Sequence, residues 1–166
     1  MKKIAFHTLG CKVNQYETEA LIEDFVSRGY ELVEFDDTAD IYVINSCTVT
    51  HVSDRKSRAM LRRAVRRNPD ALVVATGCVA QVDAEQLAAI EGVNLVVGNH
   101  DKENLAVIIE DYMQRGHASK EIFVSPITRA DKPRKILYSY HHQRTRAFVK
   151  IQDGCQNFCS YCIVPM

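Results

Sequence analysis

Three cysteines near the end of the 166-residue chain have a spacing that suits an iron–sulfur cluster. Cys155, Cys159 and Cys162 form a CxxxCxxC pattern. Three thiolates this close together can bind three irons of a cubane cluster and leave its fourth iron without a protein ligand. Gly154 before the first cysteine permits the tight backbone that such a loop needs. A zinc loop is the alternative, although zinc more often uses paired CxxC arms.

Three further cysteines, Cys11, Cys47 and Cys78, are too far apart in the sequence for a local motif. Each follows a predicted strand, and these three strands are neighbours in the sheet order predicted below. Because the carboxyl ends of parallel strands form the usual ligand crevice of an open sheet, we expect the three thiols to converge at one edge. A small hydrophobic role fits a lone cysteine well, but it fits three equivalent ones poorly. A zinc site that also uses His7 or His51 is the other alternative.

The elements that must position these cysteines are strands that alternate with helices. Strands are expected at 3–8, 31–35, 40–45, 71–76 and 94–97. Helices are expected near 15–28, 52–67, 83–91 and 102–115. This alternation implies right-handed parallel βαβ units with helices on both faces of the sheet. The sequence therefore predicts a doubly wound α/β fold with a mainly parallel, five-stranded, flavodoxin-like sheet of order 2-1-3-4-5.

The pattern changes after Gly116. A strand is predicted at 121–125, and the segment after it has two prolines, many basic residues and no clear period. A fresh strand is then predicted over 146–152, directly before the Cys155 loop. We therefore expect three parts, which are an N-terminal domain over 1–116, a basic linker over 117–145 and the truncated start of a second domain over 146–166.

The composition is that of an ordinary globular protein, with 46% apolar and 25% charged residues and a net charge of zero. No apolar run approaches the roughly 18 residues that a membrane span needs. The N-terminus has no apolar stretch of signal-peptide length. Six cysteines without a secretion signal favour reduced thiols and metal or redox chemistry. We therefore expect a cytoplasmic protein with no membrane contact.

Although the net charge is zero, acidic and basic residues are segregated along the chain. Residues 17–40 hold nine acids against one base, whereas 55–67 hold seven bases and no acid, and 129–150 hold seven bases against one acid. On the predicted 52–67 helix, four arginines share one face: Arg55, Arg58, Arg62 and Arg66. Like charges at this spacing repel, which a fold tolerates more readily when a polyanion binds them. Contact with an RNA backbone is one interpretation, and a solvated face partly neutralised by the acidic region is the other.

Four motifs in order resemble the methylthiotransferase family of radical S-adenosylmethionine (SAM) enzymes. They are TLGCKVNQYET at 8–18, NSCTVT at 45–50, GCVAQ at 77–81 and the CxxxCxxC motif at 155–162. The first two are most similar to the subfamily that acts on threonylcarbamoyladenosine beside the tRNA anticodon. The resemblance implies two 4Fe-4S clusters as cofactors. The auxiliary cluster would be held by Cys11, Cys47 and Cys78, and the SAM-binding cluster by Cys155, Cys159 and Cys162.

The same resemblance implies the reaction and its partners. SAM bound at the second cluster is cleaved to a radical that abstracts hydrogen from the C2 position of adenine, which receives a methylthio group. Tyr161 would lie beside the SAM adenine, tRNA would be the substrate, and an electron donor would be a partner. The rest of the family's barrel and its RNA-binding domain are missing, so we do not expect the chain alone to be active.

Two functions of other classes stay open from the residues alone. One is a zinc-binding structural module, and the other is a flavodoxin-like domain that binds a small ligand. Only Gly10 follows the first strand, so neither a GxGxxG nor a GxxxxGK phosphate loop is present. The third strand ends in Asn45-Ser46-Cys47, with no aspartate to phosphorylate. Nucleotide-binding and receiver-domain functions are therefore weak alternatives.

Overall fold

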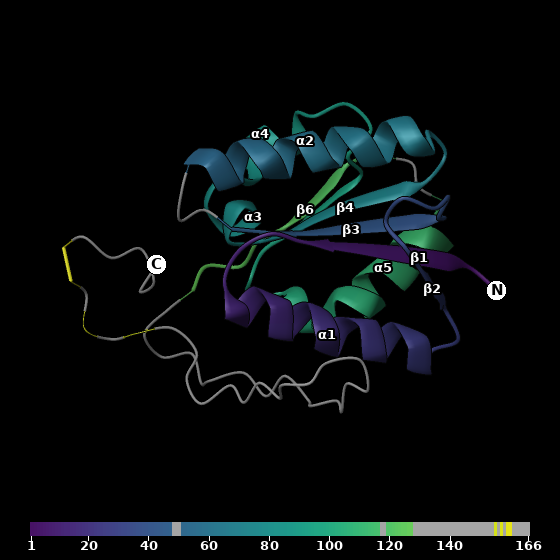
Figure 1. The fold of residues 1–166 in the computed structure, drawn as a ribbon, viewed down its shortest axis with the longest axis horizontal. Coiled ribbons are helices and arrows are strands. Elements are labelled where there is room, and N and C mark those ends of the chain that lie inside the picture. The colour runs from purple at the N-terminus through teal and green to yellow at the C-terminus, as the bar shows by residue number, and fades with distance from the viewer. Residues whose placement is uncertain (48–50, 117–118, 128–154, 156, 158, 161–166) are drawn as a thin grey trace.

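The computed structural model describes residues 1–47, 51–116, 119–127, 155, 157 and 159–160, with the backbone alone for 51–53. The predicted strand over 146–152 lies outside these residues. Within them, a central sheet is covered on one face by α2, α3 and α4 and on the other by α1 and α5 (Figure 1). The predicted doubly wound α/β class is therefore confirmed.

Six strands and five α-helices form this structure in the described part of the chain. The strands are β1 (Lys3–Thr8), β2 (Glu31–Val33), β3 (Ile41–Ser46), β4 (Leu72–Gly77), β5 (Leu95–Val97) and β6 (Glu121–Phe123). The helices are α1 (Lys12–Ser27), α2 (His51–Arg67), α3 (Cys78–Val82), α4 (Ala84–Ala88) and α5 (Leu105–Gln114), with a short 3-10 turn, η1 (Lys102–Asn104), before α5.

The sheet order is β2-β1-β3-β4-β5-β6, and every neighbouring pair is parallel. The predicted order of the first five strands is confirmed, but the predicted count of five is wrong. β6 pairs with β5 in the register Leu95↔Glu121 to Val97↔Phe123. As in the earlier βαβ units, the helix, here α5, carries the chain back to the edge of the sheet where the strands begin, so β6 runs parallel to β5. The sheet therefore continues past residue 116, where we placed the end of the domain.

Two helix boundaries differ from the prediction in a way that matters for the cysteines. Two short helices, α3 and α4, lie here: the predicted helix over 83–91 is only α4, and α3 precedes it where no helix was predicted, with Asp83 at the non-helical angles φ −140° and ψ 49° between them. The first of these begins at Cys78. The first helix of the chain begins at Lys12 rather than near residue 15, so Cys11 lies at its N-cap. Two of the three strand-end cysteines therefore lie at helix N-termini.

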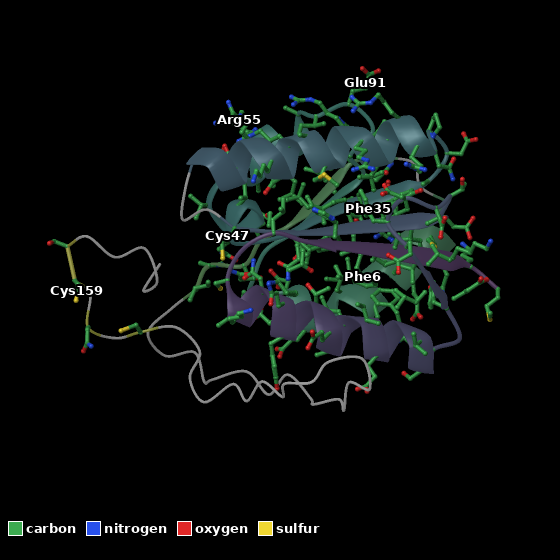
Figure 2. The ribbon with its side chains drawn as sticks, viewed as in Figure 1. Phe6, Phe35, Cys47, Arg55, Glu91 and Cys159 are labelled. Atoms are coloured by element: carbon green, nitrogen blue, oxygen red, sulfur yellow. The ribbon has the colours of Figure 1, made fainter. Side chains whose placement is uncertain are left out.

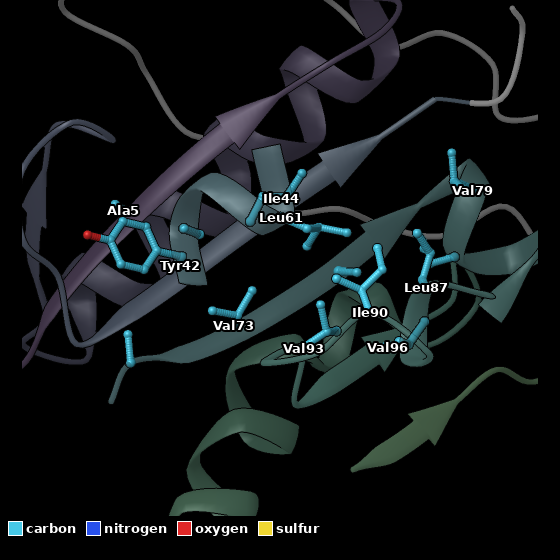
Figure 3. Close-up of a cluster of buried hydrophobic side chains, with 14 of the residues drawn as sticks. Ala5, Tyr42, Ile44, Leu61, Val73, Val79, Leu87, Ile90, Val93 and Val96 are labelled. Carbon is cyan, nitrogen blue, oxygen red and sulfur yellow. The ribbon is translucent and has the colours of Figure 1, made fainter. Parts of the chain in front are cut away.

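The two faces of the sheet have separate apolar cores. β3 and β4 are buried along their whole length, and their side chains alternate between the two faces. On the α2 face, Tyr42 and Ile44 pack with Leu61 and Val79 (Figure 3). The opposite core includes Phe25 of α1 together with strand and α5 side chains. Each fully buried aliphatic side chain contributes about 1.5–3 kcal/mol. No helix in the described ranges is long and apolar enough to cross a bilayer.

Candidate metal centre at the carboxyl ends of three strands

The ends of β1, β3 and β4 lie level with one another. Thr8 pairs with Asn45, Asn45 pairs with Thr76, and Ser46 pairs with Gly77. Cys47 and Cys78 are the residues directly after β3 and β4, and Cys47 is seen at this end of the sheet in Figure 2. The structure thus puts the three cysteine loops at one edge, on adjacent strands.

Two glycines allow these loops to approach closely. Gly10 has φ +129°, and a Cβ there would lie 2.6 Å from the Cβ of Cys47 and 3.3 Å from its Sγ. Gly77 has φ +99°, and a Cβ there would lie 2.3 Å from the carbonyl oxygen of Ser46. Both positions need the left-handed backbone that glycine adopts without strain. The first loop therefore lies directly against Cys47, and β4 leaves the sheet close to the end of β3.

Buried asparagines join the first two loops. Asn14 donates from Nδ2 to the carbonyl oxygens of Leu9 (3.1 Å) and Ser46 (3.0 Å). Asn45 donates from Nδ2 to the Asn14 carbonyl oxygen (3.1 Å) and to Thr18 Oγ1 (2.9 Å). Both asparagines are at most 2% exposed. Since buried polar groups carry a high cost when unpaired, this network holds the cysteine loops in one arrangement.

The three thiols have different surroundings. Cys11 is exposed, and its Sγ lies 3.8 Å from Asn14 Oδ1 as a hydrogen-bond donor. Cys47 is 3% exposed, and Cys78 is half-buried. The three sulfurs at this edge therefore differ in exposure, from the exposed Cys11 to the buried Cys47.

Cys78 has several polar or charged neighbours. Burial raises the pKa of the Cys78 thiol. A hydrogen bond from Asn99 Nδ2 to Cys78 Sγ (3.6 Å) and the positive charge of Lys102 both act to lower that pKa, whereas the nearby Cys47 and Glu17 act to raise it.

Beneath the cysteine edge lies a buried ion pair. Lys102 Nζ is 2.8 Å from Glu17 Oε2 and also donates to Asn45 Oδ1 at 3.3 Å. The two residues are 3% and 8% exposed. Glu17 lies in the first cysteine motif, but its partner is 85 residues away, so no sequence spacing identifies the pair. We did not predict Glu17, Lys102, Asn14 or Asn99 as site residues.

The alternative zinc site that uses His7 does not fit the position of that side chain. The His7 ring packs against Phe35 with centroids 4.9 Å apart. Burial, and then the positive charge of Arg63, lower the pKa of His7, with Asp36 opposing them. In the described residues, no three His, Cys, Asp or Glu side chains are grouped tightly enough for a single metal ion. The His51 side chain lies outside the described residues.

The donor set at this edge suits an iron–sulfur cluster. Each corner iron of a cubane takes one thiolate, so a cluster joins thiols that are farther apart than the ligands of one zinc ion. Three cysteines on three adjacent strands provide three such corners. A glycine backbone and an amide N–H beside the sulfurs are groups that accommodate and stabilise bound thiolates.

The four arginines predicted to share one face of α2 do not have the same surroundings in the structure. Arg58 forms ion pairs with Asp54 (3.0 Å) and Asp83 (2.8 Å), and its side chain is only 18% exposed. It therefore ties α2 to the start of α4. Arg55, Arg62 and Arg66 are exposed.

Other arginines of α2 interact with the acidic region, as the solvated-face interpretation expects. Arg63 and Arg67 both contact Asp36. Figure 2 shows Arg55 on the side of α2 that faces away from the sheet. On α2, the exposed Arg55, Arg62 and Arg66 are therefore available to an external polyanion.

The CxxxCxxC segment is described only in part. Cys155 is half-buried and Cys159 is exposed. Cys162 and Tyr161 lie outside the described residues, so their predicted roles as cluster ligand and SAM contact stay predictions.

Comparisons with known proteins agree with the motifs. The family model described as uncharacterized protein family UPF0004 matches residues 3–98. Proteins named threonylcarbamoyladenosine tRNA methylthiotransferase MtaB are 47% identical over 98% of the chain in Aquifex aeolicus and 47% identical over 99% of it in Bacillus subtilis. A Bacillus thuringiensis protein named tRNA-2-methylthio-N(6)-dimethylallyladenosine synthase is 30% identical over 99% of the chain.

The chain spans only part of these relatives. It covers 39% of the Aquifex aeolicus protein and 36% of the Bacillus subtilis protein. The similarity therefore includes both cysteine groups of this chain, and the relatives contain a further portion that this chain does not match.

Proposed function

The chain belongs to the UPF0004 family, and on this premise we propose that it is the N-terminal part of a tRNA methylthiotransferase. In this proposal, Cys11, Cys47 and Cys78 hold an auxiliary 4Fe-4S cluster at the sheet edge. Cys155, Cys159 and Cys162 hold the second cluster, with Tyr161 beside the adenine of SAM. The clusters supply the electron transfer and the sulfur chemistry, and the fold described above supplies the positions of the ligands.

One observation carries the proposal. Three loops from adjacent parallel strands each present a cysteine at the same edge of the sheet, and Asn14 and Asn45 lock two of them together. A domain that used its cysteines only for packing would not need this arrangement. The proteins with 47% identity that are named methylthiotransferases support the same function.

The substrate is proposed from the names of those relatives. We assign the chain to the modification of threonylcarbamoyladenosine in tRNA, at C2 of the adenine, in the cytoplasm and with an external electron donor. The exposed arginines Arg55, Arg62 and Arg66 are assigned to the tRNA backbone, since phosphate contacts fix the position of a nucleic acid without reading its sequence. Arg58 is removed from this set because two carboxylates already pair with it.

Anaerobic reconstitution of the chain with iron and sulfide tests the cofactor assignment. The unsubstituted chain is expected to take up about eight iron atoms, four for each cluster, with the visible absorption of 4Fe-4S centres. A variant with alanine at Cys11, Cys47 and Cys78 is expected to keep about four, and so is the matched variant with alanine at the three C-terminal cysteines.

The same experiment separates the proposal from its alternatives. One zinc ion bound in place of iron at the strand-end cysteines would support a structural zinc module and contradict the proposal. Full iron content in the variant that lacks the strand-end cysteines would contradict it as well. His7→Gln serves as a control, because His7 packs on Phe35 and its loss should not change the iron content.

A further inference from the structure

We propose that Asn99 is a positioning residue for the auxiliary cluster, through a hydrogen bond from its amide to the sulfur of Cys78. This inference rests on the proposed function. Asn99 lies in the connection between β5 and η1, and its Nδ2 is 3.6 Å from Cys78 Sγ. A thiolate bound to iron still accepts hydrogen bonds, so this contact remains available when the cluster is present.

The connection that carries Asn99 is braced on both sides. Gln81 accepts a hydrogen bond from the backbone N–H of His100 (3.4 Å) and donates to the carbonyl oxygen of Ser125 (3.0 Å). Asp101 accepts hydrogen bonds from the backbone N–H (2.7 Å) and the hydroxyl (2.8 Å) of Ser125. Asn99 is therefore attached to a segment whose neighbours are tied to α3 and to the chain after β6, which fixes the place of its amide.

A second asparagine beside a cysteine behaves differently. Asn14 uses its Nδ2 for the carbonyl oxygens of Leu9 and Ser46, so its Oδ1 faces Cys11. An oxygen acceptor can receive a hydrogen bond from a protonated thiol, but it cannot donate one to a thiolate. Asn99 instead presents an N–H to sulfur. The Cys78 corner is therefore the one of these two that is already arranged for a thiolate ligand.

This contact has an electronic consequence. A hydrogen bond to a ligand sulfur withdraws electron density from it, which favours the reduced cluster and raises its reduction potential. Changing Asn99 to aspartate keeps the shape of the side chain but replaces the donor with a negative charge. The oxidised cluster, with the higher positive charge, is then favoured. Changing Asn99 to alanine removes the donor without adding charge, so its effect has the same sign and a smaller size.

The test is a redox titration of the 166-residue chain, reconstituted with iron and sulfide and monitored by electron paramagnetic resonance. Alanine at Cys155, Cys159 and Cys162 leaves only the auxiliary cluster to be measured. Asn99→Asp is expected to shift the equilibrium at least tenfold toward the oxidised cluster, which for one electron is about 59 mV. Gln86→Glu makes the same chemical change on the exposed side of α4 and should leave the potential unchanged.

The possible outcomes distinguish failure of the inference from failure of the proposed function. An unchanged potential in Asn99→Asp, or an equal shift in Gln86→Glu, overturns the inference and leaves the proposed function standing. Failure of the parent chain to bind iron at the strand-end cysteines refutes the proposed function instead, and the inference falls with it. If both Asn99 variants fold with the parent's circular dichroism but lose iron, the positioning role is supported in a stronger form. If both unfold, Asn99 is a folding residue and the inference is wrong.

Discussion

Changing Lys102 to methionine is expected to destabilise this domain strongly, because a buried carboxylate then loses the charge that pairs with it. Methionine keeps most of the buried stem but removes the ammonium group, which leaves Glu17 without the partner 2.8 Å away. The two side chains are only 4% and 11% exposed, so water replaces little of the lost interaction. Breaking a buried pair by removing one partner costs about 3–5 kcal/mol. For a domain of this size, 1 kcal/mol corresponds to about 2–4 °C, so the melting temperature should fall by roughly 6–20 °C.

The assay is urea and thermal unfolding followed by circular dichroism, with two matched comparisons. Arg28→Met removes an exposed pair with Asp24 and Glu110, whose side chains are about a third exposed, and should cost at most about 1 kcal/mol. The double variant Lys102→Met with Glu17→Gln removes both charges, and its cost should be well below the sum of the single costs.

Two results would refute this reasoning. One is a cost for Lys102→Met as small as that of Arg28→Met. The other is strict additivity in the double variant, because additivity would mean that Lys102 and Glu17 do not stabilise each other.

Three further predictions follow from the described contacts. Gly77→Ala should cost at least about 3 kcal/mol in urea unfolding, since its Cβ would lie 2.3 Å from the Ser46 carbonyl oxygen at φ +99°; a change below 1 kcal/mol would contradict that close contact. In tRNA-binding measurements on the full-length protein, Arg62→Gln should reduce the slope of log binding constant against log salt concentration by about one, whereas Arg58→Gln should leave this slope unchanged. Equal slopes for the two variants would mean that exposure does not identify the arginines that contact tRNA. Burial lowers the pKa of His7 below its ordinary value of 6.5, so the unfolded chain takes up this proton first as the pH falls. The free energy of unfolding should therefore fall as the pH drops below about 6.5. His7→Gln should show a smaller fall in urea midpoint over that range, whereas parallel curves for the two proteins would contradict burial of the neutral His7 ring.

The positions of the strand-end cysteines were predictable from the sequence because two simple rules act on them. Apolar runs mark β3 and β4, both of which are buried over six residues. The topology rule for parallel sheets then gathers the residues that follow such strands at one edge. Cys47 and Cys78 needed nothing beyond those two rules, and the predicted order of the first five strands followed from the same alternation.

The features that were missed depend on contacts between distant parts of the chain. The sequence predicts a strand at 121–125 but not its place in the sheet, because pairing with β5 rather than its own three-residue pattern makes β6 the sixth strand. From the sequence alone, Lys102 cannot be distinguished from a surface lysine near the start of a helix, because only the fold brings Glu17 to it. Asn99 likewise resembles any loop asparagine, and only the adjacency of β4 and β5 brings it to Cys78.

An iron anomalous-scattering map of crystals of the anaerobically reconstituted chain tests the central claim most directly. The account predicts a four-iron peak at the carboxyl ends of β1, β3 and β4, within bonding distance of the sulfurs of Cys11, Cys47 and Cys78. The absence of iron from that edge in a chain that carries iron at Cys155 and Cys159, or a single zinc ion there instead of a cluster, would contradict it.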